Sequence, residues 1–209
     1  MVNAEGHVGS PTKEVGLRKL SYFIGMSLDG YIAGPDGEIQ FLLDQVSPAY
    51  LEYLKTEWPE TLATPGRQYF GCDDAENTRY DTVLMGRATY ALGLKDGVVD
   101  PYAHLSTYVF SRSLTQPPHA SVQLVTGDPV AKVRELKRRD GLGIWLCGGG
   151  DLAGQLAEEI DELVIKTYPV LAGAGIRMVS GEFAARQFEL IESRSFDNGA
   201  VVAKYARKR

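Results

Sequence analysis

Three consecutive glycines, Gly148 to Gly150, constrain the fold more than any other feature of the sequence. They separate an apolar run, Ile144 to Cys147, from a segment of helical character that begins at Asp151. Consecutive glycines lose much backbone entropy on folding, so chains keep them where the backbone takes unusual angles or lies against another group. A strand, a glycine turn and a helix start together present free N–H groups that suit a phosphate. A tight turn without a ligand is the alternative explanation.

Apolar runs alternate with amphipathic segments along the chain, which is typical of a mainly parallel sheet in an α/β protein. The expected strands are 18–26, 82–85, 107–110, 122–125, 144–147 and 162–171, and the expected helices are 47–58, 151–159 and two that begin at 87 and 128. Two last strands, 187–196 and 200–206, flank Asn198-Gly199. Asn-Gly predicts a type I′ hairpin, in which both central residues have positive φ.

No internal repeat and no second apolar core divides the sequence, so we predict one domain over residues 18–209, after a flexible tail at 1–17. Residues 27–37 are predicted to form a loop. The stretch from about 59 to 79 is polar and has no regular pattern. We interpret it as an insertion that serves either as a lid or as a contact surface.

The net charge of -5 argues against general binding to nucleic acids or to anionic membranes. The 2 cysteines and 3 histidines are not spaced as metal ligands, so no metal site is expected. No stretch reaches membrane-spanning length and no signal-peptide pattern opens the chain, so we expect a cytoplasmic protein.

Two other predicted strands also end in residues that suit a phosphate, namely Gly86 to Thr89 and Ser111 to Ser113. Because ligands of open α/β sheets bind outside the carboxyl ends of the strands, these segments and the glycine turn are expected to lie together. Arg87 and Arg112 with a glycine turn suit a ligand that has a pyrophosphate and a further phosphate, such as NADPH. Each arginine taken alone is better explained by a solvated position, and it is their placement at the same edge of the sheet that favours a ligand. The spacing does not match Gly-x-Gly-x-x-Gly, which disfavours a Rossmann domain.

A polar turn follows the first predicted strand, and Asp29 lies in it. Asp29 is either a simple turn residue or a catalytic group at the reacting end of the ligand. The proton of a reduction would come from water or from a nearby residue, and Asp29 is the only candidate residue.

Together these segments resemble the dihydrofolate reductase-like superfamily, specifically the reductase domain of bacterial riboflavin biosynthesis, which forms the C-terminal part of a bifunctional deaminase-reductase. The likeness covers about residues 18–206, and its matching segments are 27–33, 82–90, 108–112, 144–150 and 161–173. It implies a mixed, mainly parallel eight-stranded sheet flanked by helices and closed by an antiparallel hairpin. It also implies NADPH across the strand ends and a cis peptide between Gly148 and Gly149.

The resemblance further assigns a part of the cofactor to each segment. Residues 86–89 and 111–113 would hold the phosphates on the adenosine side, residues 148–150 the pyrophosphate, and the loop at 27–33 would face the nicotinamide. The cofactor-binding residues expected in this way are Ser27, Ile32, Gly86, Arg87, Ala88, Thr89, Ser111, Arg112, Ser113, Gly148, Gly149, Gly150 and Leu152.

Departures from the family narrow the expected function. Glu52 and Glu57 do not align with the carboxylate of folate reductases, and neither the tryptophan-bearing folate loop nor the zinc motif of the deaminase is present. We therefore expect a stand-alone NADPH-dependent reductase that transfers hydride to a small polar heterocycle, carbonyl or imine, similar to 5-amino-6-(5-phosphoribosylamino)uracil reductase. The alternatives are an NADPH- or nucleotide-binding protein without turnover, and a pterin or dihydrofolate reductase. Members of this branch often pair, so we expect a homodimer, with Val170 and Leu171 in its apolar interface.

Overall fold

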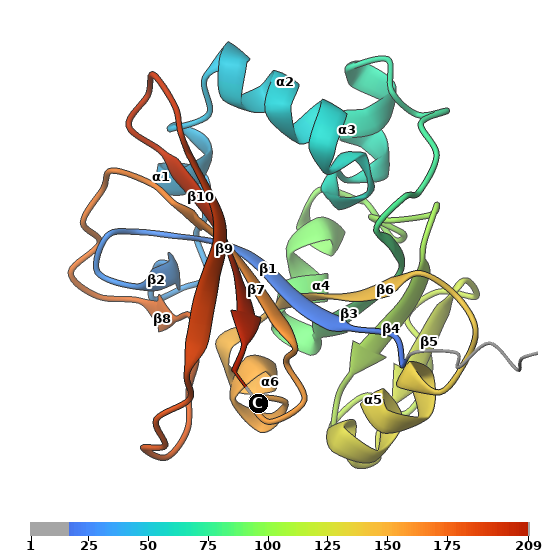
Figure 1. Ribbon diagram of the computed structural model, residues 1–209. Helices are drawn as coiled ribbons and strands as arrows, with labels where there is room; N and C mark the ends of the chain where they lie inside the picture. Colours follow the sequence, from blue (N-terminus) through green and yellow to red (C-terminus); the bar gives the residue numbers. More distant parts are fainter. Residues whose placement is uncertain (1–16, 209) are drawn as a thin grey trace, which may run out of the picture.

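A mixed eight-stranded sheet forms the centre of the protein, seen in a computed structural model that describes residues 17–208 (Figure 1). Its strands lie in the order β5 (Val122–Val125), β4 (Ser106–Phe110), β3 (Tyr80–Gly86), β6 (Gly143–Gly148), β1 (Leu20–Met26), β7 (Glu162–Thr167), β10 (Val201–Arg207) and β9 (Phe188–Ser195). The strands from β5 to β7 run parallel, and β10 is antiparallel to both β7 and β9. This confirms the predicted architecture and its closing hairpin. The tail predicted at 1–17 lies, except for its last residue, outside the described residues.

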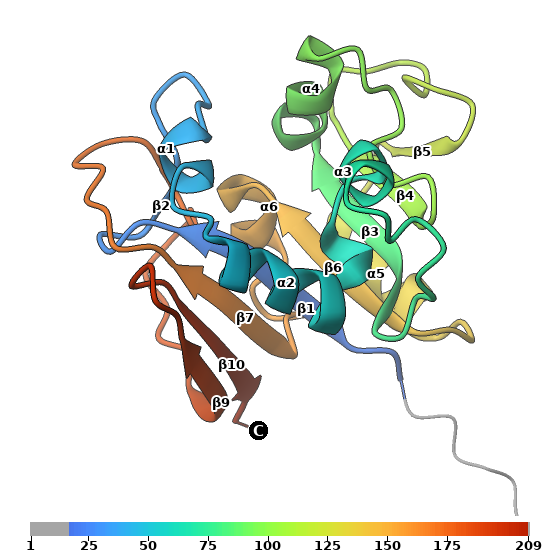
Figure 2. The same cartoon turned by 90° about the horizontal axis from the view of Figure 1, so that it is seen from above.

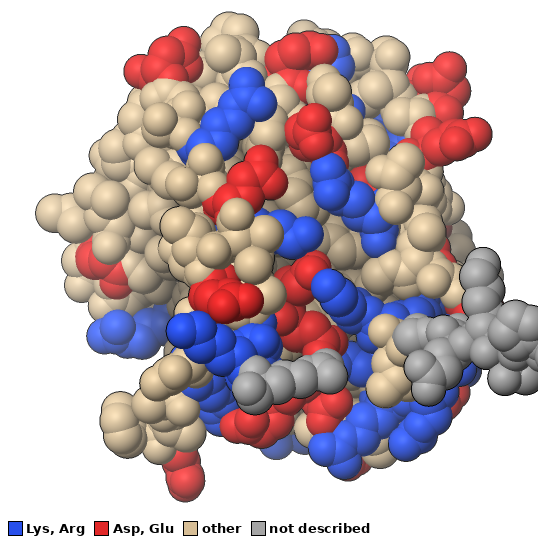
Figure 3. Space-filling model, in the orientation of Figure 1, with Lys and Arg blue, Asp and Glu red and all other residues tan. Residues whose placement is uncertain are grey.

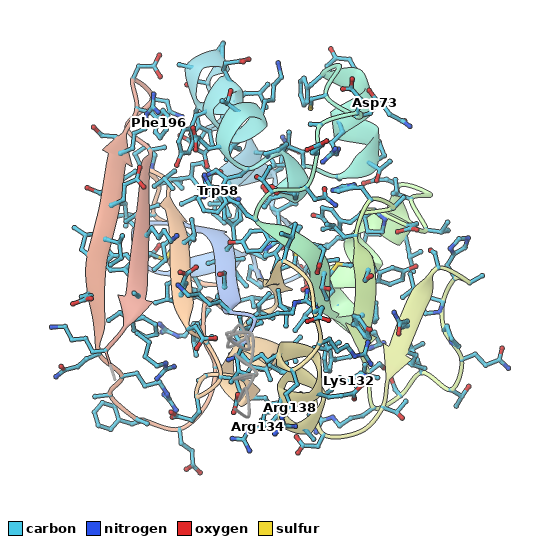
Figure 4. The ribbon with its side chains drawn as sticks, turned by 45° about the vertical axis from the view of Figure 1, so that its right-hand side comes forward. Trp58, Asp73, Lys132, Arg134, Arg138 and Phe196 are labelled. Atoms are coloured by element: carbon cyan, nitrogen blue, oxygen red, sulfur yellow. The ribbon has the colours of Figure 1, made fainter. Side chains whose placement is uncertain are left out.

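Helices cover both faces of the sheet (Figure 2). One apolar core includes residues of α2 (Pro48–Glu57), α4 (Arg87–Lys95) and the short α1 (Gln40–Leu43), and the opposite core includes residues of α5 (Pro129–Lys137) and α6 (Gly150–Gln155). Successive strand residues alternate between the cores: Met85 belongs to the first and Leu84 to the second. In the first core Trp58 packs on Phe23 of β1 with ring centroids 5.0 Å apart (Figure 4).

The predicted helix starts at Ser47 and Asp128 are confirmed. The Ser47 hydroxyl accepts a hydrogen bond from the Tyr50 N–H at 3.3 Å, and the Asp128 carboxylate accepts one from the Val130 N–H at 2.9 Å. Each cap is followed by a proline, whose missing N–H costs nothing at the first helical position.

The stretch at 59–79 is ordered, which corrects the expectation of an irregular insertion. It contains the 3-10 turn η1 (Pro59–Thr61) and the helix α3 (Thr64–Tyr69). Arg67 is 2% exposed and donates to the carbonyl oxygens of Pro59 at 3.0 Å and Ala75 at 2.5 Å. A helix this short has too few residues for a periodic pattern, and the segment is held by side chains that bind its backbone.

The closing hairpin differs from the predicted type I′ turn. Gly199 has a φ of 79°, but Asn198 does not have positive φ, and neither does any other described residue except glycines. The Asn198 side chain instead accepts a hydrogen bond from the Ala200 N–H at 3.0 Å. Asparagine thus closes a three-residue loop in which only glycine is left-handed.

A second small sheet pairs β2 (Tyr31–Ala33) with β8 (Ile176–Arg177). Strand β2 lies inside the predicted loop at 27–37, where three residues are too few to show an alternation of apolar and polar side chains. No helix in the described part of the chain is long and apolar enough to cross a membrane. Basic and acidic side chains intermingle on the face shown in Figure 3. Leu171 is 72% exposed, and the homodimer stays a prediction.

Candidate functional site

A cavity of about 1260 Å³ opens at the carboxyl ends of β3, β4, β5 and β6. Residues of α1 and α4 form its walls, and Figure 2 shows these two helices facing each other above the strand ends. All the predicted cofactor residues except Ser27 line this cavity, and those that do are Ile32, Gly86, Arg87, Ala88, Thr89, Ser111, Arg112, Ser113, Gly148, Gly149, Gly150 and Leu152. The fold therefore brings together strand ends that are far apart in the sequence.

The order in which the chain adds strands to the sheet reverses between β3 and β6, and the cavity lies at this point. Strands β3 and β6 are neighbours, with Met85 opposite Gly148. The helix after β3 packs on one face of the sheet and the helix after β6 packs on the other, since Tyr90 and Leu152 belong to opposite cores. Ligands of open α/β sheets bind at such a switch point because the two helices leave a crevice between them.

The first two glycines of the turn, Gly148 and Gly149, lie close to Gly86 and Thr89 across this crevice. The peptide bond between Gly148 and Gly149 is cis. A Cβ added to Gly149 would lie 3.3 Å from the Thr89 hydroxyl oxygen, and one added to Gly86 would lie 3.6 Å from the Gly149 nitrogen. Neither α4 nor α6 has a side-chain cap at its start, so N–H groups of both first turns lack a side-chain partner.

The third glycine has a packing role that the sequence did not show. A Cβ on Gly150 would lie 2.2 Å from the carbonyl oxygen of Arg177, and one on Gly154 would lie 1.6 Å from that of Ser180. The segment after β8 therefore packs directly on the backbone of α6. Gly150 lines the cavity, but this packing alone already requires a glycine there.

Two guanidinium groups at the cavity are available to a ligand. Arg87 and Arg112 are exposed and line the cavity, and neither makes a hydrogen bond or ion pair with another residue of 17–208. The Ser111 hydroxyl is engaged in its own loop, where it accepts hydrogen bonds from the N–H groups of Ser113 at 3.2 Å and Leu114 at 3.1 Å. Ser111 thus shapes the loop that carries Arg112.

The sequence did not indicate two parts of the cavity lining. One is a fourth strand end, and the other is the far end of the cavity, by which we mean the end at β7. Thr126 and Gly127 follow β5 and line the cavity, and the rule that singled out Gly86, a glycine just after a strand, applies to them equally. The far end is lined by Tyr102, Cys147, Lys166 and Tyr168. A lysine inside an apolar strand was the available signal for that end.

Burial governs the ionisation of the groups at the far end. Burial lowers the pKa of Lys166 to about 8 and raises that of the Cys147 thiol to about 11. Burial also raises the pKa of Tyr102 and of Tyr168. At neutral pH this end of the cavity therefore holds one cation among neutral groups.

The structure does not bring Asp29 or Ser27 to the cavity lining. The Asp29 carboxylate accepts hydrogen bonds from the Ser27 hydroxyl at 2.6 Å and from the N–H groups of Ala172 at 3.0 Å and Gly173 at 2.7 Å. The Ser27 hydroxyl and these N–H groups lower the pKa of Asp29 to about 2. Ionised Asp29 has no proton to donate at neutral pH, so the geometry favours the turn residue over the catalytic group.

Asp29→Asn is expected to destabilise the protein at pH 7 and to have progressively less effect in acid. The folded pKa of about 2 lies below the ordinary value of 3.8. The ionised carboxylate therefore adds stability above pH 3.8, and this is lost as the pH falls through 2. Urea unfolding between pH 2 and 7 measures it, with Asp36→Asn as the control, because the Asp36 carboxyl accepts no hydrogen bond within 17–208. A constant stability gap across this range contradicts the assignment.

Comparison with known proteins agrees with the fold. A relative in Bacillus subtilis (strain 168), the uncharacterized protein YwjB, is 32% identical over 161 residues, which span 76% of this chain and 81% of YwjB. A crystal structure from Shewanella sp. PV-4, described as that of a riboflavin biosynthesis protein, has a TM-score of 0.69 and 26% identity and covers 91% of this chain and 99% of its own.

The dihydrofolate reductase of Enterococcus faecalis, solved in complex with NADP(H), shares the fold. Its TM-score is 0.58 at 15% identity, over 91% of this chain and 97% of its own. This likeness confirms the dihydrofolate reductase-like architecture that the sequence predicted. The family model of the RibD C-terminal domain matches residues 18–202, nearly the whole described chain. The chain belongs to the family of RibD C-terminal domains.

Proposed function

We propose that this protein is an NADPH-dependent reductase that acts on a small polar heterocycle, carbonyl or imine. The observation that carries the proposal is that two guanidinium groups without a partner among residues 17–208, those of Arg87 and Arg112, line the same cavity as the glycine turn at the switch point. Two cations on adjacent strand ends suit two phosphate positions of one ligand, because charge-assisted hydrogen bonds to phosphate are among the strongest that side chains make.

The residues of the cavity fit such a cofactor. Gly86 and Gly149 leave the cavity wall without side chains at this point, and the first turns of α4 and α6, which have no side-chain cap, begin beside it. Arg87 and Arg112 would hold the phosphates on the adenosine side, and residues 148–150 the pyrophosphate. The cofactor, when bound, supplies the hydride. Ile32 and Leu42, both buried, would exclude water from the far end.

The relatives support the same conclusion. The riboflavin-related description of the Shewanella protein and the NADP(H) complex of the Enterococcus reductase both point to nicotinamide-dependent reduction. Folate itself is a poorer candidate substrate. Glu57 pairs with Arg79 at 2.8 Å and Glu52 with Lys55 at 3.0 Å, and neither glutamate lines the cavity.

Titration with NADPH and with NADH tests the cofactor assignment. We expect micromolar binding of NADPH, seen by calorimetry or by quenching of protein fluorescence, and weaker binding of NADH. Absence of binding by both cofactors contradicts the proposal.

A substrate screen then separates the two remaining functions: NADPH binding without oxidation of NADPH by any carbonyl, imine, pterin or pyrimidine indicates a nucleotide-binding protein without turnover.

A further inference from the structure

A lysine lies at the far end of the cavity without an acidic partner. Lys166 is partly buried on β7, and its ammonium group makes no hydrogen bond or ion pair with any other residue in 17–208. Its ammonium nitrogen lies 4.3 Å from the centroid of the Phe23 ring. A cation over an aromatic face is stabilised, but far less than a cation that meets an anion.

The acidic group nearest to Lys166 along its own strand is already neutralised. Glu162 lies on the same face of β7, four residues away, which is about 13 Å along a strand. Its carboxylate pairs with Lys19 at 2.8 Å and with Lys204 at 3.8 Å. The neighbouring strands place Gly25 of β1 and Val202 of β10 beside Lys166, and neither carries a charge.

The residues around Lys166 indicate what shape of ligand would fit beside it. A Cβ on Gly25 would lie 2.9 Å from Cε2 of Tyr168 and 3.7 Å from Cε of Lys166, so the glycine lets the Tyr168 ring and the Lys166 chain pack directly on the backbone of β1. Tyr102 and Cys147 line the same end as neutral groups. A flat ring with one anionic edge fits a lining that offers the aromatic rings of Tyr102 and Tyr168 and a single cation.

Lys166 is also far from the arginines that the cofactor would use. In the sheet order, β6 and β1 lie between β3 and β7, so the end of β3 is about 14 Å from β7 at ordinary strand spacing. The strand that leads to Arg112 is one spacing further. A single anionic group of a ligand therefore cannot contact Lys166, Arg87 and Arg112 at the same time.

We propose that Lys166 binds an anionic oxygen of the substrate, so that the cavity selects flat ring compounds with a carboxylate or an ionised ring oxygen over their neutral counterparts. The name substrate rests on the proposed reductase function, whereas the preference for an anion does not. A buried cation without a partner is unfavourable in the free protein, and a bound anion removes this penalty. The lowered pKa of Lys166 agrees with this reading, because burial opposes its charge.

Paired ligands of nearly the same shape test the proposal. Benzoate is compared with benzamide, and orotate with uracil-6-carboxamide, by calorimetry or ligand-observed NMR, with and without NADPH. We expect the acids to bind about 10- to 150-fold more tightly than the amides to the wild-type protein. In Lys166→Met this preference should disappear, and in Lys166→Arg, which keeps the charge, part of it should return.

Lys204→Met is the matched control, because Lys204 lies on the same sheet face one strand away and outside the cavity. It should keep the preference for the acids. The melting temperature of the ligand-free Lys166→Met protein should be unchanged or higher, since a buried charge has been removed. A purely structural lysine would instead lower the melting temperature.

Other outcomes either overturn the proposal or separate it from the reductase function. Equal binding of acids and amides by the wild-type protein, no binding of either, or an undiminished preference in Lys166→Met removes the anion site. Loss of NADPH binding in Lys166→Met reassigns the lysine to the cofactor. If the wild-type protein binds the acids selectively but binds no NADPH, the reductase proposal fails and the anion site stands.

Discussion

The double variant Arg87→Ala, Arg112→Ala is expected to bind NADPH about two to four orders of magnitude more weakly than the wild-type protein, and each single variant about 10- to 150-fold more weakly. Both side chains are exposed and have no partner among residues 17–208. Their removal therefore breaks no internal contact, and the loss of affinity reports the ligand alone. NADH, which lacks the additional phosphate of NADPH, should be affected much less.

Calorimetric titration of each variant with NADPH and NADH measures this difference. Arg138→Ala is the control, because Arg138 is also exposed, ends α5 and lies outside the cavity lining (Figure 4). Its affinity for NADPH should equal that of the wild-type protein. Equal weakening of NADPH and NADH in the double variant contradicts the assignment of the arginines to the additional phosphate, and unchanged NADPH affinity contradicts their contact with the cofactor.

Gly154→Ala is expected to destabilise the protein by at least about 3 kcal/mol. The added Cβ would lie 1.6 Å from the carbonyl oxygen of Ser180 and 2.8 Å from its carbonyl carbon. Both atoms belong to the backbone, so no side-chain rotation relieves the overlap, and α6 must move away from the segment after β8. This movement would also disturb Gly150, four residues earlier in the same helix and itself packed on Arg177.

Urea unfolding of Gly154→Ala and Gly66→Ala measures the effect. Gly66 is also helical, but the nearest atom to its added Cβ is the flexible Phe70 ring at 3.9 Å. Gly66→Ala should be neutral or about 0.5–1 kcal/mol stabilising, because alanine loses less backbone entropy. Similar free energies of unfolding for the two variants contradict the contact between α6 and the segment that contains Ser180.

The role of Asp29 could not be predicted from a local sequence motif. A carboxylate in a turn beside a strand end suits catalysis and turn formation equally, and the sequence offers no way to choose. The deciding contacts come from Ala172 and Gly173, more than 140 residues away. Lys166 is a residue for which the sequence suggested no function. A charge in a strand suggests an exposed position, whereas the structure places Lys166 between β1 and β10 in the cavity lining, without an ion-pair partner among residues 17–208.

The sequence by itself determined the alternation of strands and helices, the helix starts at Ser47 and Asp128, and the phosphate-type strand ends at Gly86, Ser111 and Gly148. These features follow from hydrophobic periodicity, capping and turn chemistry, which act over a few residues. Only the tertiary structure decided that these ends meet at one switch point, that Gly150 and Gly154 serve packing, and that Lys166 lines the cavity. Such properties depend on contacts between residues distant in the chain, and no local pattern encodes those contacts.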